Sequence, residues 1–189
     1  MIAALYVEPD GVYSGRADVD AWPESRDARL YAGPWPVVAH PPCQRWSRLA
    51  HIHKHKPGKA IGEDGGCFYA AWAAVETWGG VLEHPAGSAA WPAFGLTPPV
   101  RGTWSRGLFA GEWTTEVDQC WYGHIAAKRT WLAFVGNDCP APMDWREAPE
   151  PTHRSPGGSC GVELQPRNRR NATPPAFAEV LIELARGAR

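Results

Sequence analysis

The chain has 189 residues, which at the usual ~150 residues per domain corresponds to about one domain with a single sizeable core. Its 19 basic and 20 acidic side chains give a net charge of −1, which argues against a strongly basic nucleic-acid coat protein. No stretch approaches the ~20 apolar residues that a membrane span needs, and the first residues lack the basic region of a signal peptide. We therefore expect a cytoplasmic protein without a membrane segment.

The composition adds two expectations. The 11 tryptophans exceed what one small core needs, so some of them are expected to line a cleft or a binding face. The five cysteines are an odd number and form no Cys-x-x-Cys pair, a pattern that fits reduced thiols better than a disulfide framework.

The first third of the chain alternates apolar runs with turn residues. Ile2–Val7 predicts a strand, and residues 14–35 predict a loop with one short helix around Glu24–Leu30. The run 36–40 predicts a buried strand that ends at a Pro-Pro pair. Gly and Lys residues make 51–66 a loop-rich segment.

Helical spacing becomes clear at 67–78, where apolar residues recur three and four positions apart and a Gly-Gly pair follows. A short strand is expected over 81–85, irregular structure over 86–112, and two strands around 114–121 and 130–135. Such alternation is typical of an α/β sheet, whose functional residues gather at the carboxyl ends of its strands.

The C-terminal part is expected to be a loop, 137–172, followed by one clear helix. Thr173 is predicted to cap this helix, Pro174 to occupy its first turn, and one stripe to face the core: Phe177, Val180, Leu181 and Leu184. The chain contains no dinucleotide or phosphate-loop motif. We therefore expect residues 1–189 to form a single α/β domain.

The strongest chemical signal is the segment Pro41–Ser47 (PPCQRWS), directly after the predicted strand 36–40. The two prolines restrict the backbone before Cys43, so its sulfur is held at the strand end, as covalent catalysis by a thiolate requires. A buried structural cysteine, the usual role of a free thiol, is the alternative interpretation.

Two further segments carry polar residues at strand ends. Glu83-His84-Pro85 follows the next predicted strand, and a carboxylic acid beside a thiolate can donate a proton to a ring nitrogen while the sulfur attacks the ring. An exposed glutamate at a strand–loop junction is the alternative. In the segment 119–132, a Gly turn and the basic pair Lys128 and Arg129 lie between two strands, a platform suited to cationic contacts. Surface lysines and arginines are, however, mostly just solvated.

Together the three segments resemble the cytosine-C5 DNA methyltransferases. In that family a Pro-Cys-Gln segment supplies the nucleophile for C6 of cytosine, a Glu-Asn-Val segment supplies the acid for N3, and a Gly-x-x-x-x-Arg-x-Arg segment contacts the substrate. The resemblance implies that Cys43 is the nucleophile and Glu83 the acid, with Lys128 and Arg129 as further catalytic residues. It also implies a set of substrate-binding residues, among which the indole would stack on an extruded base: Pro42, Gln44, Trp46, Ser47, His84 and Pro85.

Weaker similarities point to the family's cofactor, S-adenosylmethionine. Asn171 and Thr173 lie in a segment (NATPP) that is similar to the family's closing Gly-Asn-Ala-Val-Pro-Pro, which helps to form the cofactor pocket. Glu8, after the first strand, is similar to the carboxylate that holds the ribose, and Asp27 to the acid that contacts adenine. The implied fold is a reduced, Rossmann-like methyltransferase-type sheet.

The chain departs from the family in several respects. Phe-x-Gly-x-Gly, the first motif, is absent, so the chain is expected to start at the family's second strand; no segment is long enough for the domain that reads DNA sequence. His84-Pro85 replaces Asn-Val, and Lys128 and Thr130 stand where arginines are usual. Such a shortened chain looks like the compact methyltransferase-like proteins of bacteriophages, with DNA as the expected partner.

Several alternatives stay open. An enzyme that modifies free pyrimidine nucleotides at C5 would use the same thiolate chemistry; thymidylate synthases do so from a Pro-Cys context, although they place His where this chain has Gln44. A catalytically degenerate scaffold would instead bind DNA or a host protein. His51, His53 and His55 alternate as metal ligands can, but they lack the partners of a zinc site, and no metal is expected.

Overall fold

The structure, a computed structural model, confirms the predicted α/β class. No helix in the part of the chain that it describes is long and apolar enough to cross a membrane. The described residues are 1–52, 56, 60–108, 111–143, 149–154, 163–164 and 171–188.

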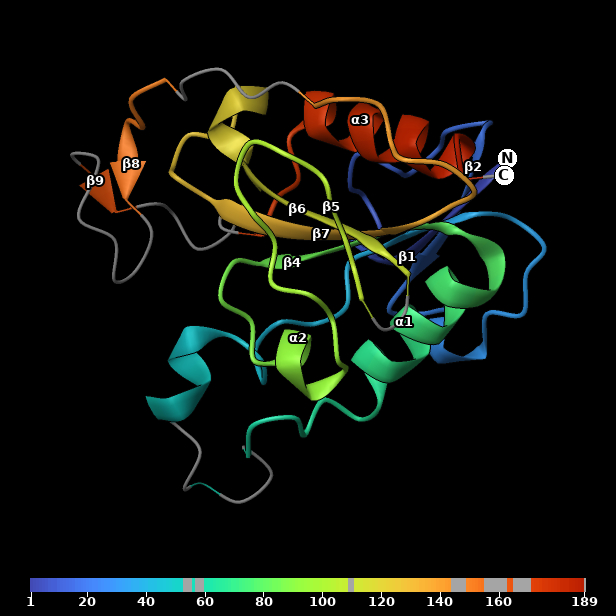
Figure 1. The fold of residues 1–189 in the computed structure, drawn as a ribbon, viewed down its shortest axis with the longest axis horizontal. Helices are drawn as coiled ribbons and strands as arrows, with labels where there is room; N and C mark the ends of the chain where they lie inside the picture. Colours follow the sequence, from blue (N-terminus) through green and yellow to red (C-terminus); the bar gives the residue numbers. More distant parts are fainter. Residues whose placement is uncertain are drawn as a thin grey trace.

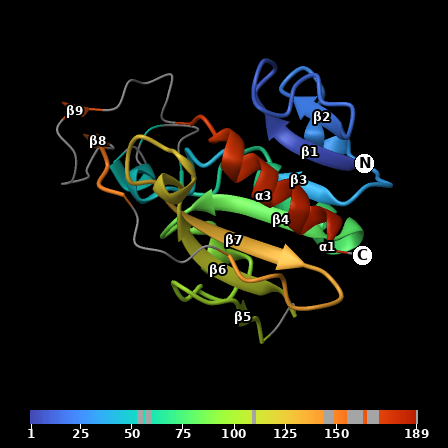
Figure 2. The same ribbon diagram turned by 90° about the horizontal axis from the view of Figure 1, so that it is seen from above.

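A seven-stranded mixed sheet runs through the middle of the molecule, in the order β2-β1-β3-β4-β7-β6-β5 (Figures 1 and 2). The first four strands in this order pair in parallel, and the last three pair antiparallel to their neighbours. The strands are β1 (Ile2–Val7), β2 (Val19–Pro23), β3 (Val37–Ala39), β4 (Gly80–Pro85), β5 (Ser105–Arg106), β6 (Trp113–Asp118) and β7 (Arg129–Val135).

The parallel part of the sheet changes direction at its centre. From β1 the chain moves outward to β2, and it then returns to the other side of β1 to form β3 and β4. This places a topological switch point between β1 and β3, and in doubly wound sheets ligands bind outside the carboxyl ends of the strands at such a point. β1 and β3 therefore border the point at which a ligand is expected in a sheet of this order.

One long helix covers each face of the sheet. The helix α1 (Cys67–Trp78) has the predicted bounds, and it packs on the face that Ala3, Ala39 and Leu82 present. The helix α3 (Pro175–Arg186) packs on the other face (Figure 2). Because both faces are covered, the three residues of β3 are completely buried, as is typical of parallel strands.

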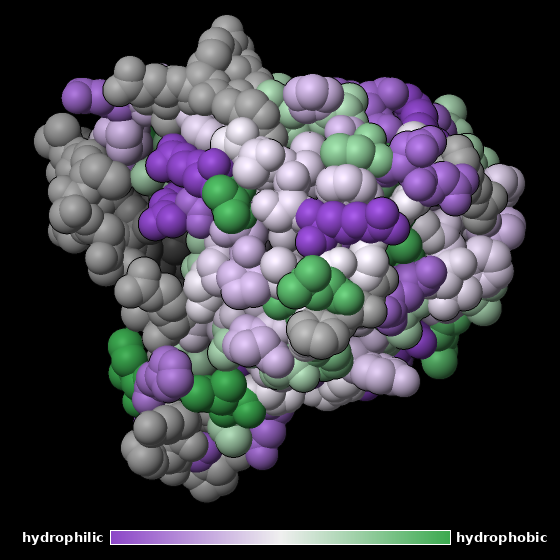
Figure 3. Space-filling model, viewed as in Figure 1, coloured by the Kyte–Doolittle hydropathy of each residue, from purple (hydrophilic) through white to green (hydrophobic). Residues whose placement is uncertain are grey.

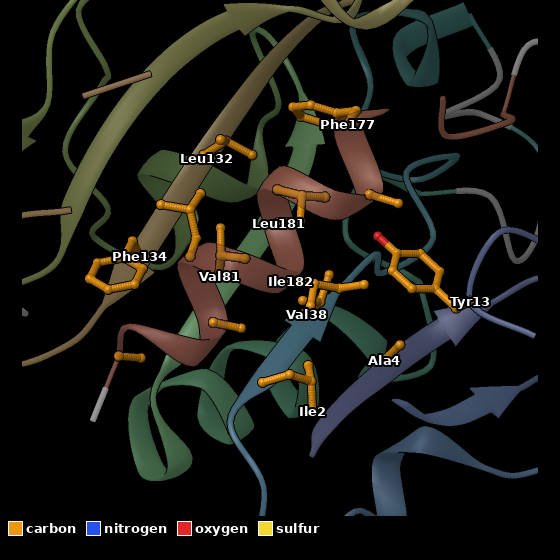
Figure 4. Close-up of a cluster of buried hydrophobic side chains, with 14 of the residues drawn as sticks. Ile2, Ala4, Tyr13, Val38, Val81, Leu132, Phe134, Phe177, Leu181 and Ile182 are labelled. Atoms are coloured by element: carbon orange, nitrogen blue, oxygen red, sulfur yellow. The ribbon is translucent and has the colours of Figure 1, made fainter. Parts of the chain in front are cut away.

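The core under α3 is made of aliphatic and aromatic side chains (Figure 4). Three of the four residues of the predicted stripe on α3 are buried, and Val180 is half-buried. The helix presents Phe177, Leu181 and Ile182 to side chains from the central strands of the sheet: Val38, Val81, Leu132 and Phe134. On the surface, larger hydrophobic residues lie in small groups among polar ones (Figure 3).

The Gly-Gly pair after α1 is required by the packing of β3 on β4. Gly79 ends the helix with a φ of 74°, and its N–H donates to the carbonyl of Val75. Gly80 has a φ of 124°, and a Cβ there would lie 2.0 Å from the carbonyl oxygen of Val37. A side chain at Gly80 would therefore push the two central strands apart.

The predicted strands are present, but several shorter elements differ from expectation. Residues 14–35, expected to be a loop with one short helix, contain the strand β2 (Val19–Pro23), which pairs with β1 at one edge of the sheet. The helix around 24–30 is a 3-10 turn, η1 (Ala28–Leu30), and the strand predicted over 114–121 ends at Asp118, where the 3-10 helix η3 (Gln119–Tyr122) begins. Residues 86–112, expected to be irregular, contain β5 and the short helix α2 (Ala90–Ala93).

The two C-terminal predictions also need correction. Thr173 does not cap the last helix: Pro174 occupies the cap position without a side-chain hydrogen bond, and Pro175 begins the helix. The loop 137–172 contains a small parallel pair, β8 (His153–Arg154) with β9 (Glu163–Leu164). Of the loop 51–66, the described part includes the end of a 3-10 helix, η2 (Arg48–Ile52).

We expect Leu181→Ala to lower the free energy of unfolding by about 2–5 kcal/mol, because it leaves a cavity between α3 and the sheet. Val180→Ala, on the same helix but half-buried, is the matched control and should cost about 1 kcal/mol. Urea unfolding followed by circular dichroism measures both. Equal losses for the two variants would contradict the assigned helix face.

Candidate functional site

The candidate nucleophile follows β3 directly. The backbone N–H of His40 donates to the carbonyl of Leu5 (3.1 Å), which holds the end of β3 against β1. The chain then turns sharply, because the carbonyl of Cys43 accepts from the N–H groups of Trp46 (3.0 Å) and Ser47 (2.8 Å). Cys43 is half-buried, and its two neighbours are exposed: Pro42 and Gln44.

The thiol of Cys43 is protonated in the free protein. Burial raises its pKa, and the negative charge of Glu83 raises it further, whereas the positive charge of Lys128 acts in the opposite direction. These effects show that the three groups lie within electrostatic range of one another. The thiolate therefore has to be formed during a reaction rather than waiting in the resting site.

Glu83 lies inside β4 rather than at its end, and its side chain is almost completely buried. His40 Nδ1 lies 3.1 Å from Oε2, and Gln119 Nε2 donates to Oε1 over 3.1 Å. Burial alone would raise the pKa of Glu83, but the hydrogen bond from His40 and the charge of Lys128 lower it to about 2. The carboxylate is therefore ionised at neutral pH, and it accepts a hydrogen bond from Nδ1–H of His40.

The hydrogen bonds continue beyond Glu83 through residues that the sequence did not single out. The hydroxyl of Tyr13 lies 2.9 Å from His40 Nε2, on the side of the ring away from Glu83. Gln119 Nε2 also donates to Thr130 Oγ1 (2.9 Å). The sequence could have pointed to His40, because this residue directly precedes the Pro-Pro pair. Tyr13 lies in the turn between β1 and β2, and no motif in the sequence marks it.

Lys128 connects the site to the C-terminal segment. Its Nζ donates to the backbone carbonyls of Ala172 (3.3 Å) and Asn171 (3.5 Å), just before α3. Its charge also acts on both Cys43 and Glu83. The structure therefore brings together four of the predicted site residues from four separate parts of the chain: Cys43, Glu83, Lys128 and Asn171.

Arg129 is not part of this group, because consecutive strand residues point to opposite faces of a sheet. Thr130 faces Glu83 through Gln119, so Arg129 faces away. Its guanidinium pairs with the buried carboxylate of Glu116 (2.7 Å), which also accepts from Trp131 Nε1 (2.9 Å). These three residues line a separate open pocket of about 190 Å³, together with Ala86 and Gly87.

His84 also points away from Glu83, for the same reason. It is completely buried, with its ring 5.2 Å from that of Phe68 and 6.3 Å from that of Trp91. Burial lowers its pKa to about 4, so His84 is neutral at neutral pH. Its surroundings are those of a core residue rather than a substrate ligand.

Trp46 is likewise part of the core. Its Nε1 donates to Asp64 Oδ2 (2.7 Å), and its ring lies 5.8 Å from those of both Phe68 and Phe94. The indole is 8 % exposed, so it has no free face on which an extruded base could stack. Of the other predicted substrate residues, two are half-buried: Ser47 and Pro85.

The residues predicted to hold S-adenosylmethionine do not fit that group in this structure. Glu8 is exposed at the end of β1. Asp27 caps η1 and pairs with Arg29 (2.7 Å), so its oxygens are already engaged. Asn171 is exposed and Thr173 half-buried, on the Lys128 side of the molecule. Neither acid presents a buried acceptor to a ribose or an adenine.

The histidine hypothesis is tested only in part. His51 is exposed at the end of η2, and His53 and His55 lie outside the described residues. Among the residues that the structure does describe, no group of three or more His, Cys, Asp or Glu side chains is arranged to hold a metal ion.

The chain matches no family model and no curated protein. Inferences about its chemistry therefore depend on the residues gathered at the carboxyl ends of β3 and β4 and on the motifs that carry them. The group around Glu83 has three properties of a reactive site: a half-buried thiol, a buried carboxylate with a shifted pKa, and a nearby cation.

The buried His84 predicts a pH dependence of stability. Its pKa is about 4 in the folded protein against 6.5 when exposed, so the unfolded chain binds a proton first as the pH falls. The free energy of unfolding should therefore decrease from about pH 6.5 to about pH 4, by at most about 1.4 kcal/mol per pH unit for this group. Glu83 affects stability over a lower pH range. Its pKa falls from the usual 4.5 to about 2 in the folded protein, so its contribution to the free energy of unfolding is lost as the pH falls from about 4.5 to about 2.

Denaturant unfolding at several pH values checks this prediction. His84→Phe should flatten the curve between pH 6.5 and 4, whereas the control His51→Gln, at an exposed position, should leave it unchanged. A variant His84→Phe with the full wild-type slope would show that other groups cause the dependence.

Proposed function

We propose that the protein modifies cytosine at C5 by covalent addition of Cys43 to C6, in the manner of the cytosine-C5 DNA methyltransferases. The observation that carries this proposal is that the charges of Glu83 and Lys128 lie within electrostatic range of the Cys43 thiol, which follows the carboxyl end of β3. A thiol, a carboxylate and a cation are the groups that nucleophilic attack on a pyrimidine ring uses.

The sheet order supports a Rossmann-like, methyltransferase-type fold. The parallel strands follow the order 2-1-3-4 of doubly wound sheets, with the switch point between β1 and β3. Cys43 comes four residues after the last pairing of these two strands, and the N–H of His40 still bonds to β1. The proposed nucleophile therefore lies at the edge where such folds bind their ligands.

The chemistry follows from the electronics of cytosine. When the Cys43 thiolate adds to C6, the electrons of the C5–C6 double bond move to C4–C5, and those of C4–N3 move to N3, which takes up a proton. Glu83 is the acid that the proposal assigns to N3. C5 then becomes nucleophilic, and loss of its proton after substitution releases the thiolate. In duplex DNA the base must first leave the stack, which costs a few kcal/mol.

The electrophile that C5 attacks is not assigned by the structure. S-adenosylmethionine would supply a methyl group, but Glu8 and Asp27 do not form a site for it here. We therefore derive no step through this cofactor. The proposal stands on the addition step, which Cys43 and Glu83 carry by themselves.

Covalent trapping tests the proposal. A 5-fluorocytosine oligonucleotide, incubated with the protein and S-adenosylmethionine, should give an adduct that survives denaturation and is detected by intact mass spectrometry, because a C5 that carries fluorine and a transferred methyl group has no proton whose loss would release the thiolate. Without S-adenosylmethionine the addition reverses, so that reaction is the negative control. Cys43→Ser should give none, because the hydroxyl is a far weaker nucleophile than a thiolate. Cys67→Ser is the matched control, since Cys67 is also a half-buried free thiol, and it should react as the wild type does.

A parallel reaction with 5-fluorodeoxycytidine monophosphate shows whether the substrate is DNA or the free nucleotide. An adduct on the nucleotide but not on DNA would place the activity at the nucleotide level. The absence of an adduct on both would overturn methyl transfer from S-adenosylmethionine by this protein and favour a scaffold that binds DNA or a host protein.

A further inference from the structure

A second candidate site lies at the carboxyl end of β4, on the face of the sheet opposite to Glu83. It is the open pocket of about 190 Å³ beside the ion pair of Arg129 and Glu116, which Trp131 and the turn after β4 also line. The strands β4, β7 and β6 lie side by side here (Figure 2). The chemistry proposed for Cys43 uses none of these lining side chains, so the pocket needs an explanation of its own.

Glu116 fixes the guanidinium of Arg129 in one orientation. The carboxylate, whose side chain is 6 % exposed, accepts from Arg129 Nε (2.8 Å) and Nη2 (2.9 Å) and from Trp131 Nε1 (2.9 Å). The side chain of Arg129 is itself 59 % exposed, and its Nη1 has no hydrogen-bond partner among the described residues. The edge formed by Nη1 and Nη2 is therefore available to a ligand, with donors that are already oriented.

The chemistry of this edge selects a ligand with two neighbouring acceptors. Parallel N–H donors of an arginine match a carboxylate, a phosphate or the O6 and N7 atoms of guanine. Glu116 compensates the charge of Arg129, and no other described residue that lines the pocket is cationic, so an anion gains little there. Trp131 adds an aromatic surface, on which bases stack. These properties favour a neutral base, and guanine is the base that presents two adjacent acceptors.

The pocket lies within reach of a nucleotide next to the target cytosine. Ala86 follows β4 three residues after Glu83, which corresponds to about 10 Å along an extended strand. In the same turn the N–H of Ala89 donates to the carbonyl of Trp46 (2.8 Å), three residues after Cys43. A strand of DNA that presents a cytosine to Cys43 can therefore place an adjacent base in the pocket.

We infer that this pocket binds a guanine next to the target cytosine, with Nη1 and Nη2 of Arg129 donating to its O6 and N7. The inference rests on the proposed function and adds a sequence preference to it. Arg129 is a specificity-determining residue, and Glu116 is a positioning residue that acts through it. Adenine presents an amino group in place of O6, so it leaves one donor of Arg129 without an acceptor.

Binding of single-stranded oligonucleotides, measured by fluorescence anisotropy, tests the inference. Each oligonucleotide carries one central cytosine, flanked on both sides by guanine, by adenine or by 7-deazaguanine, which lacks N7. The wild type should bind the guanine oligonucleotide at least about 5-fold more tightly than either of the others, the lower end of what a bidentate base contact contributes. This comparison needs no variant, so it is decisive even if a variant does not fold.

Arg129→Gln should reduce the affinity for the guanine oligonucleotide to that for the adenine oligonucleotide, and leave the latter nearly unchanged. Arg106→Gln, at an exposed arginine of β5, is the matched control and should keep the preference. Thermal unfolding identifies which variants are folded.

Three results would overturn the inference. The first is equal binding of the guanine and 7-deazaguanine oligonucleotides by the wild type, or binding of neither. The second is a guanine preference that persists in folded Arg129→Gln. The third is an Arg129→Gln variant that binds all oligonucleotides more weakly by the same factor, which is the effect of losing a phosphate contact.

Covalent trapping of 5-fluorocytosine reports separately on the proposed function. An adduct that forms without any guanine preference in binding would uphold Cys43 and overturn the role of the pocket. A guanine preference that depends on Arg129, without an adduct, would uphold the pocket as a base-binding site and overturn methyl transfer.

Discussion

Burial of the Glu83 carboxylate is the constraint on which the arrangement of the site depends. A charge removed from water costs several kcal/mol unless donors replace its hydration, and loss of one partner leaves an uncompensated charge. In this protein the donors come from segments far apart in the sequence, His40 after β3 and Gln119 at the start of η3. Satisfying one carboxylate therefore holds β4, β3 and the β6–β7 connection in a single relative position.

The residues around Glu83 lie on one face of the sheet. The side chains of Glu83 and Thr130 belong to the α3 face, with Val81 and Leu132, whereas His84 and Arg129 point toward the α1 face. His84 and Arg129 therefore lie on the opposite face from their sequence neighbours Glu83 and Lys128. There the aromatic core holds His84, and the ion pair with Glu116 holds Arg129. Cys43, which follows β3, lies within electrostatic range of Glu83 and Lys128.

The sequence predicted much of the fold, because periodicity is a local property. The bounds of α1 followed from apolar spacing and a glycine pair, and the central strands followed from short buried runs between turn residues. Cys43 and Glu83 became candidates because their motifs resemble a known family. Thr173 was misassigned as a cap because Pro174 and Pro175 already preset the first helical turn without a side-chain acceptor.

The remaining features depend on pairing between distant strands. His40 and Glu83 are 43 positions apart, and they meet because β3 pairs with β4 in parallel. Which of Lys128, Arg129 and Thr130 reaches the site depends on the register of β7 against β4, and shifting that register by one residue would exchange the faces. Trp46 was expected at a binding surface, but its partner Asp64 lies in a loop whose course the sequence does not reveal.

Exchange of the hydrogen at C5 of cytosine tests the central claim most directly, because it needs no cofactor. Addition of Cys43 to C6 makes C5 nucleophilic, so in D₂O it takes up a deuteron, and reversal of the addition returns cytosine labelled at C5. The measurement is the intensity of the H5 proton resonance of a cytosine-containing oligonucleotide, or of deoxycytidine monophosphate, incubated with the protein. We predict a progressive loss of this resonance with the wild type and none with Cys43→Ser. An undiminished H5 resonance with the wild type, or an equal loss with Cys43→Ser, would contradict the account.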